Sequence, residues 1–244
     1  EMSKHLIIYT ARTGSTVVEH HVAQNLCNPP FNFWEHDFYS TEIHPCEYQM
    51  FFDKLKKIND VGIKDWSMKY LVTTGVVDLT PQQEPQQQTE CAFDLSATDN
   101  FFRGLNVTDL HFCFRIDCLD TICSHMIAEM DASFVVTDNK IREHKKRHID
   151  TEYIKTRCTR YQRDCYLYNE YVDRYKDDYN CTFYPYEKLN EFIDIDNDIR
   201  GMKKQLSKEQ KQELIINYDE VVQIAKQYPF YHGKRNEKTG VLET

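Results

Sequence analysis

Short runs of consecutive apolar residues alternate along the chain with longer stretches in which apolar residues recur every three or four positions. The short runs predict buried strands, and the longer stretches predict amphipathic helices. Strands are expected at residues 6–10, 61–66, 109–114 and 182–186, while 70–79 fits either a helix or a strand. Helices are expected at residues 15–26, 46–58, 151–177 and 208–227, and in the segment after 115. Helices that separate strands predict an α/β fold with a parallel sheet.

The turn after the first expected strand is small and polar, and it is followed at once by an expected helix. Its sequence is Ala11-Arg12-Thr13-Gly14-Ser15-Thr16. The first N–H groups of a helix lack internal partners and favour an anion, and Arg12 would add a positive charge. We therefore expect this loop to hold a phosphate or sulfate group. The alternative is an ordinary turn with a Ser/Thr N-cap, and the loop lacks the GxxxxGK[ST] pattern of a standard nucleotide-binding loop.

Length and charge limit the classes of protein to consider. With 244 residues, the chain predicts one large domain over 1–244, and the Gln/Pro-rich segment 81–90 predicts an exposed loop rather than a domain boundary. A net charge of −9 argues against general nucleic-acid binding. An anion site in such a protein must be made locally, from helix N-termini and a few basic side chains.

The apolar runs and the cysteines indicate where the protein is expected to reside. No apolar run approaches the roughly 20 residues needed to span a membrane, and no secretory signal is apparent. The nine cysteines show no CxxC pair, so we expect reduced thiols in a cytoplasmic protein without a metal site. The sequence leaves the oligomeric state open, a homodimer included.

Candidate groups for proton transfer lie in the aromatic and acidic segment 31–40. A carboxylate or an imidazole of this segment, such as Glu35 or His36, could accept a proton in a poorly hydrated pocket mouth. A packed surface loop is the competing interpretation.

A second basic position follows the expected strand 109–114. Arg115 comes directly after this strand, and Ser124 lies in the helix beyond it. Because open α/β sheets bind ligands at the C-terminal ends of their strands, both side chains could reach a ligand held by residues 11–16. A glycine-bounded basic segment, 232–240, could close over an anion or could be a frayed tail.

The order of these motifs resembles the sulfotransferases that use 3′-phosphoadenosine 5′-phosphosulfate (PAPS). The series comprises Arg-Thr-Gly-Ser-Thr, Gly-Ile-Lys, a strand that ends in Arg, a helical Ser, Tyr-Glu-Lys-Leu and a late basic segment with Gly. It is most similar to the small bacterial carbohydrate-sulfotransferase branch. The resemblance implies a P-loop-type parallel sheet flanked by helices on both faces, and PAPS as the donor with PAP as its product.

The resemblance also implies roles for individual residues. The residues that match the loop for the 5′-phosphosulfate are Arg12, Thr13, Gly14, Ser15 and Thr16, and those that match the 3′-phosphate pair are Arg115 and Ser124. Tyr184 or Tyr186 would lie near the adenine. Lys234 and Arg235 resemble the basic loop that closes on the 3′-phosphate. Lys64 matches a lysine of the acceptor pocket, and Trp66 stands two residues further on.

The chain departs from the family pattern at several of these positions. Many members of the family have Lys at the position of Arg12. An arginine there retains the positive charge and adds bidentate geometry. Arg115 and Ser124 are nine residues apart, where many members have eight. Trp66 occupies the position of the catalytic His of the cytosolic branch, so we expect Glu35 or His36 to be the base. The late loop has the order Gly-Lys-Arg in place of Arg-Lys-Gly.

The resemblance implies transfer of a sulfuryl group to a hydroxyl or amine of a small-molecule or carbohydrate acceptor, without a metal. Arg12 and the N–H groups of residues 13–16 would stabilise the developing charge. Two alternatives remain open at this point: another P-loop transferase of the kinase type, and a catalytically inactive homologue that binds PAP.

Overall fold

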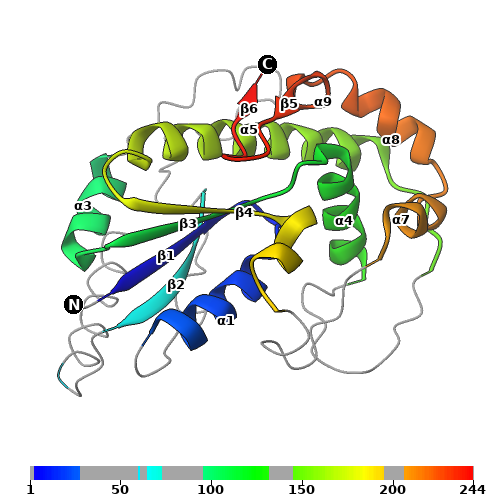
Figure 1. Cartoon of the computed structure of the whole chain (residues 1–244). Helices are drawn as coiled ribbons and strands as arrows, with labels where there is room; N and C mark the ends of the chain where they lie inside the picture. Colours follow the sequence, from blue (N-terminus) through cyan, green and yellow to red (C-terminus); the bar gives the residue numbers. More distant parts are fainter. Residues whose placement is uncertain are drawn as a thin grey trace.

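The computed structural model describes residues 3–27, 60, 65–72, 96–131, 145–194 and 206–243 (Figure 1). The strands are β1 (Lys4–Tyr9), β2 (Trp66–Leu71), β3 (Asp109–Phe114), β4 (Asn180–Pro185), β5 (Lys234–Arg235) and β6 (Leu242–Glu243). The helices are α1 (Ser15–Leu26), α3 (Ser96–Leu105), α4 (Cys118–Met130), α5 (Thr151–Tyr175), the 3₁₀ helix η2 (Tyr186–Glu191), α7 (Lys208–Leu214), α8 (Tyr218–Ala225) and α9 (Pro229–His232).

The four longer strands form one parallel sheet in the order β2-β1-β3-β4. In the register, Ile7 of β1 lies between Lys69 of β2 and His111 of β3. Because all four strands run the same way, the loops that follow them meet at one edge of the sheet. The expected parallel α/β sheet is thus confirmed. β5 and β6 form a separate antiparallel pair.

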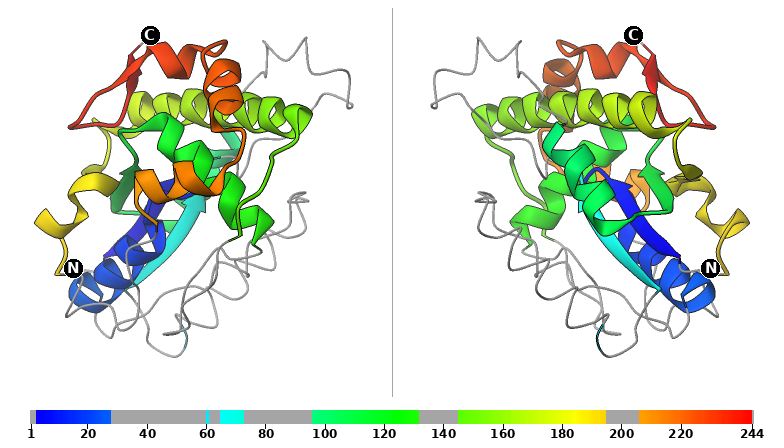
Figure 2. Two further views of the ribbon diagram at one scale, coloured as in Figure 1. Left: turned by 90° about the vertical axis from the view of Figure 1, so that its right-hand side faces the viewer. Right: turned by 90° about the vertical axis from the view of Figure 1, so that its left-hand side faces the viewer.

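Helices cover both faces of the sheet. On one face, side chains such as Leu6, Met68 and Phe112 join residues of α3 and α5 in a large apolar core. On the other face, Ile7, Tyr9 and Cys113 pack with α1 and with the η2 segment. Figures 1 and 2 show α5 running across one side of the sheet and α1 lying on the opposite side. This double cover explains why every residue of the two central strands after the first is buried.

A further apolar core lies between α4, α5 and the helices of the C-terminal part. Met126, Cys158, Val221 and Phe230 are among its buried members. Side chains cap three of the helices: Asp117 caps α4, Asp150 caps α5, and Ser207 caps α7. Ser207 and Gln210 form the capping box that the sequence pattern indicates.

Two predicted elements differ from the structure. The second strand begins at Trp66, where the predicted strand 61–66 ends, and residues 61–64 lie outside the described residues. The predicted helix 208–227 is divided into α7 and α8. It is interrupted because the N–H of Arg147 bonds to the carbonyl of Leu214 and the N–H of Ile216 bonds to the carbonyl of Arg147. Beyond α8, Pro229 is the first residue of α9.

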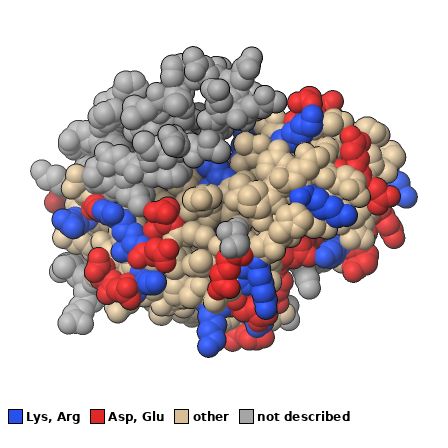
Figure 3. All heavy atoms as spheres, turned by 90° about the horizontal axis from the view of Figure 1, so that it is seen from above, with Lys and Arg blue, Asp and Glu red and all other residues tan. Residues whose placement is uncertain are grey.

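Charged groups of both signs alternate on the described surface seen from above in Figure 3. The described residues include no helix that is long and apolar enough to cross a membrane. The predicted helix 46–58 and the predicted loop 81–90 lie outside the described residues.

Candidate functional site

The loop between β1 and α1 has a backbone shape that few residues adopt. Arg12 and Gly14 both lie in the left-handed region, with φ of 67° and 75°. The Thr13 hydroxyl donates a hydrogen bond to the carbonyl of Thr10 at 2.8 Å, which fixes the start of the loop. A non-glycine residue at positive φ is uncommon and often marks a functional loop.

Gly14 is needed for two separate reasons. Its φ is unfavourable for other residues, and a Cβ placed there would lie 2.8 Å from Cδ1 of Leu189 and 3.0 Å from Cδ2 of Tyr186. Gly14 also occupies the N-cap position of α1, so this position supplies no side-chain cap, and the first turn contains no acidic residue. The start of α1 is therefore chemically suited to receive an anion.

Arg115 follows β3 directly and is buried with 6% of its surface exposed. Its Nη2 lies 2.8 Å from the Asp120 carboxylate, and its guanidinium carbon lies 3.9 Å from the centre of the Tyr186 ring. Among the described residues, its buried Nε has no hydrogen-bond partner. Buried donors are nearly always paired, so this Nε is available to a ligand oxygen.

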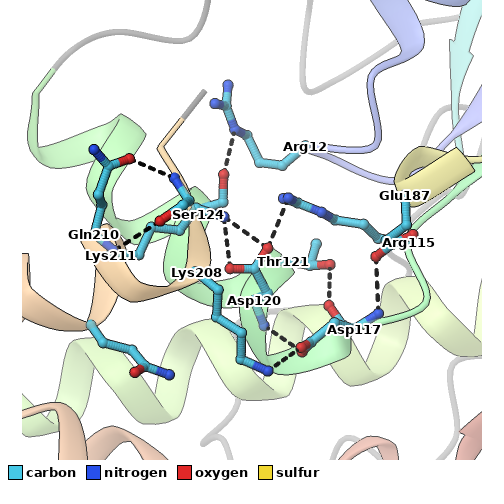
Figure 4. A network of polar contacts seen from close by, with 12 residues as sticks. Arg12, Arg115, Asp117, Asp120, Thr121, Ser124, Glu187, Lys208, Gln210 and Lys211 are labelled. Atoms are coloured by element: carbon cyan, nitrogen blue, oxygen red, sulfur yellow. Dashed lines mark hydrogen bonds and ion pairs between the residues drawn. The ribbon is translucent and has the colours of Figure 1, made fainter. Parts of the chain in front are cut away.

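Asp120 links Arg115 to a second buried cation. The Nζ atom of Lys211 lies 2.6 and 2.7 Å from the two oxygens of Asp120 (Figure 4), and Lys211 is only 2% exposed. Burial, followed by repulsion from Arg115, lowers the pKa of Lys211. One carboxylate thus serves two buried cations, which leaves this group with an excess of positive charge.

The η2 segment braces the turn that carries Arg115. The Glu187 carboxylate accepts hydrogen bonds from the N–H groups of Ile116, at 3.0 and 3.1 Å, and of Asp117, at 3.2 Å. Tyr186 stacks on the Arg115 guanidinium from the same segment. The Tyr-Glu-Lys-Leu motif therefore orients Arg115, a role that the sequence did not suggest.

The structure brings Arg12 to the residues that follow β3. The Arg12 Nε lies 3.4 Å from the Ser124 hydroxyl on α4 (Figure 4). Burial, followed by repulsion from Arg115, lowers the pKa of Arg12 to about 10, so Arg12 is still charged at neutral pH. The predicted residues Arg12, Arg115 and Ser124 thus form one cluster at the C-terminal edge of the sheet.

Lys69 of β2 is a further cation of this edge, and it was missed by the sequence analysis. It is 7% exposed, its Nζ donates to the Thr16 hydroxyl at 3.1 Å, and it lies 5.5 Å from the centre of the Tyr9 ring. The sequence signal for this residue is a lysine within an apolar strand. It was not recognised because the second strand was predicted at 61–66, before Lys69.

A second polar cluster lies beside Ser124 and joins α4 to α5. Glu129 accepts from Tyr153 and from Arg157, and the His125 Nε2 lies 3.6 Å from Glu129. Burial is the main factor that lowers the pKa of His125 to about 4, and repulsion from Arg157 and Arg12 contributes. His125 is therefore neutral at pH 7.

Several predicted site residues lie elsewhere. Trp66 is fully buried at the start of β2, paired in register with Lys4, so it lies at the opposite edge of the sheet in the main core. Its predicted place in an acceptor pocket stays a prediction, because Lys64 and the segment 31–40 lie outside the described residues. Tyr184 is buried and packs beside the rings of His111 and Phe192.

The late basic segment forms the β5–β6 hairpin. Lys234 is exposed, whereas Arg235 is 2% exposed and points to Cys165 on α5. No hydrogen bond or ion pair found among the described residues links either of them to Arg115 or Ser124. The structure thus does not bring this pair to the predicted 3′-phosphate position. Glu35, His36 and Lys64 lie outside the described residues.

Within the described ranges, no group of three or more metal-binding side chains is found. No protein-family model matches the chain, and neither the curated proteins nor the solved structures that were compared include a match.

Proposed function

We propose that this protein is a PAPS-dependent sulfotransferase that moves a sulfuryl group to a hydroxyl or amine of a small-molecule or carbohydrate acceptor. The observation that carries the proposal is the pair Arg12 and Arg115. These two cations follow neighbouring parallel strands, and the pKa of Arg12 is lowered by burial and then by repulsion from Arg115. An anionic ligand between them would relieve that repulsion.

The residues at this edge fit a donor that carries an anion at each of two positions. The loop 12–16 and the start of α1 would hold the 5′-phosphosulfate. Arg115, through the Nε that no described residue bonds, and the Ser124 hydroxyl would hold the 3′-phosphate. The stacking of Tyr186 and the ion pair with Asp120 hold the Arg115 guanidinium in place, so little side-chain entropy is lost on binding.

When bound, PAPS would supply a sulfuryl group whose bond to the bridging oxygen breaks as the bond to the acceptor forms. Arg12 would stabilise the charge that develops on the bridging oxygen, together with the N–H groups of residues 13–16. The proton of the acceptor hydroxyl would pass to Glu35 or His36, which remain the predicted bases. Lys69 would hold the Thr16 hydroxyl in the loop.

Donor preference tests the proposal. The melting temperature of the protein is measured with PAP, with 5′-AMP and with ATP plus Mg²⁺. We expect PAP to stabilise the protein more than 5′-AMP does, because only PAP carries the 3′-phosphate that Arg115 and Ser124 would bind. Stabilisation by ATP with Mg²⁺ but not by PAP would indicate a kinase-type transferase and overturn the proposal.

An arginine variant identifies the phosphate position. Arg115→Ala should weaken PAP binding by roughly 10- to 100-fold, since a charge-assisted hydrogen bond contributes about 1.5–3 kcal/mol. Arg103→Ala is the matched control, because Arg103 is exposed on α3. Equal PAP affinities for the two variants would contradict the assignment. Transfer of ³⁵S from labelled PAPS to a panel of acceptors then distinguishes an enzyme from a protein that only binds PAP.

A further inference from the structure

Two ion pairs join α7 to the first turn of α4. Lys208 and Lys211 are three residues apart, so they lie on the same face of α7. The Lys208 Nζ lies 2.5 Å from a carboxylate oxygen of Asp117, and the Lys211 Nζ lies 2.6 and 2.7 Å from the two oxygens of Asp120 (Figure 4). Lys208 is exposed, whereas Lys211 is only 2% exposed. The second pair therefore lies inside the protein, beside Arg115.

Asp120 has a buried counter-charge even without Lys211. Arg115 is 6% exposed, and its Nη2 lies 2.8 Å from Oδ2 of Asp120. One cation neutralises one carboxylate, and the burial of a second cation is costly. Charge balance alone therefore does not account for Lys211.

Lys211 limits how much of the Asp120 carboxylate is left for Arg115. An arginine and a carboxylate frequently pair through two parallel N–H···O bonds. Among the described residues, Oδ1 of Asp120 is bonded by Lys211 alone, and Oδ2 is shared between Lys211 and Nη2 of Arg115. The contact between Arg115 and Asp120 is thus single, and no described residue bonds the buried Nε of Arg115.

We propose that Lys211 is a positioning residue that holds Asp120 away from the Nε of Arg115 and so keeps this N–H open for a phosphate oxygen. The inference rests on the proposed function, in which Arg115 binds the 3′-phosphate. Without Lys211, Asp120 would rotate to bond both Nε and Nη2 of Arg115. That bidentate pair would occupy an N–H group that the phosphate needs. Tyr186 stacks 3.9 Å from the guanidinium carbon and holds Arg115, so the movement would come from Asp120.

The backbone of α7 is held at both ends, and this fixes the position of Lys211. Ser207 and Gln210 form the capping box at the start of the helix. At its end, the carbonyl of Leu214 accepts a hydrogen bond from the N–H of Arg147 at 2.9 Å. Replacement of the Lys211 side chain should therefore leave α7 in place.

Crystal structures of the Lys211→Met variant without nucleotide test the geometry. We expect Nε and Nη2 of Arg115 each to lie within about 3.2 Å of a different oxygen of Asp120. Lys211→Leu is a second apolar variant, to be used if the methionine variant does not fold. A variant in which Asp120 keeps its single contact with Arg115 would overturn the proposal.

Lys208→Met is the matched control for both measurements. Lys208 lies on the same helix as Lys211 and also pairs with an aspartate of α4. Among the described residues, no hydrogen bond or ion pair joins that aspartate, Asp117, to the Arg115 side chain. We therefore expect Arg115 and Asp120 in this control to keep the geometry of the parent chain.

Nucleotide affinity, measured by titration calorimetry, tests the consequence for binding. Lys211→Met should weaken PAP binding by roughly 10-fold or more, the effect of one charge-assisted hydrogen bond, and should leave 5′-AMP binding within about twofold. The double variant Lys211→Met/Asp120→Asn should recover most of the PAP affinity, because a neutral amide competes poorly for the guanidinium. A double variant that binds PAP no better than Lys211→Met would mean that Asp120 does not compete for Arg115, and the proposal would be wrong.

The two measurements separate this inference from the proposed function. A parent chain that does not prefer PAP to 5′-AMP would contradict the proposed 3′-phosphate position. The nucleotide-free structures would still decide whether Lys211 holds Asp120 away from the Nε of Arg115.

Discussion

Replacing Gly14 with Ala tests the shape of the loop between β1 and α1. The added methyl group encounters two obstacles. A left-handed conformation costs a non-glycine residue about 1–2 kcal/mol, and Gly14 has a φ of 75°. The Cβ would also lie 2.8 Å from Leu189 and 3.0 Å from Tyr186. Overpacking of this kind typically costs about 1–3 kcal/mol.

The two effects together predict that the free energy of unfolding falls by about 2–5 kcal/mol. Urea titration followed by far-UV circular dichroism measures this loss directly, provided that the slope of the transition is unchanged. Gly104→Ala is the matched control, because Gly104 is exposed within α3 and should gain about 0.5–1 kcal/mol from the same substitution. A loss below about 1 kcal/mol in Gly14→Ala would refute the reasoning, since neither obstacle could then have its usual size.

Two further predictions concern stability. Burial is the main factor that lowers the pKa of His111, to about 3, and repulsion from His5 adds to it. The unfolded chain therefore binds a proton that the folded chain rejects, so stability should be complete above pH 6.5 and decline as the pH falls towards 3. At pH 5 the free energy of unfolding should be about 2 kcal/mol lower than at pH 7 because of His111. Urea titrations at the two pH values should show a smaller difference in the free energy of unfolding for His111→Gln than for the parent chain. Ser207→Ala removes the cap of α7 and should lower the free energy of unfolding by about 1 kcal/mol. Ser207→Thr is the conservative control, because it retains a capping hydroxyl. Equal stability of the alanine variant and the parent chain would mean that the cap is not stabilising.

The sequence pattern predicts those elements of the fold that local physics specifies. α1 spans residues 15–26 and β3 spans residues 109–114, as predicted, because in each case the apolar pattern and the flanking residues agree. β2 was misplaced because it contains Ser67 and Lys69, which disguise a buried strand. Lys69 is accommodated by Thr16, a partner 53 residues away that no local pattern reveals.

The site shows the same division between local and distant information. Arg12 and Gly14 were identified from the loop, and Arg115 from the end of its strand, since each position follows directly from a local motif. Lys211 reaches Asp120 across 91 residues of sequence, so only the tertiary structure could reveal it. The division of the predicted helix 208–227 likewise depends on backbone hydrogen bonds from a distant segment.

Three residues of η2 touch both halves of the proposed donor site. Leu189 lies against Gly14, Tyr186 lies over Arg115, and Glu187 holds the N–H groups at the start of the α4 turn. A displacement of either of the proposed anion-binding loops would therefore disturb η2, which contacts the other. This gives a physical basis for a coupling free energy between the two ends of one ligand, so that occupying one phosphate position would tighten the other. A bisphosphate nucleotide would then bind more tightly than the separate affinities of its two halves imply.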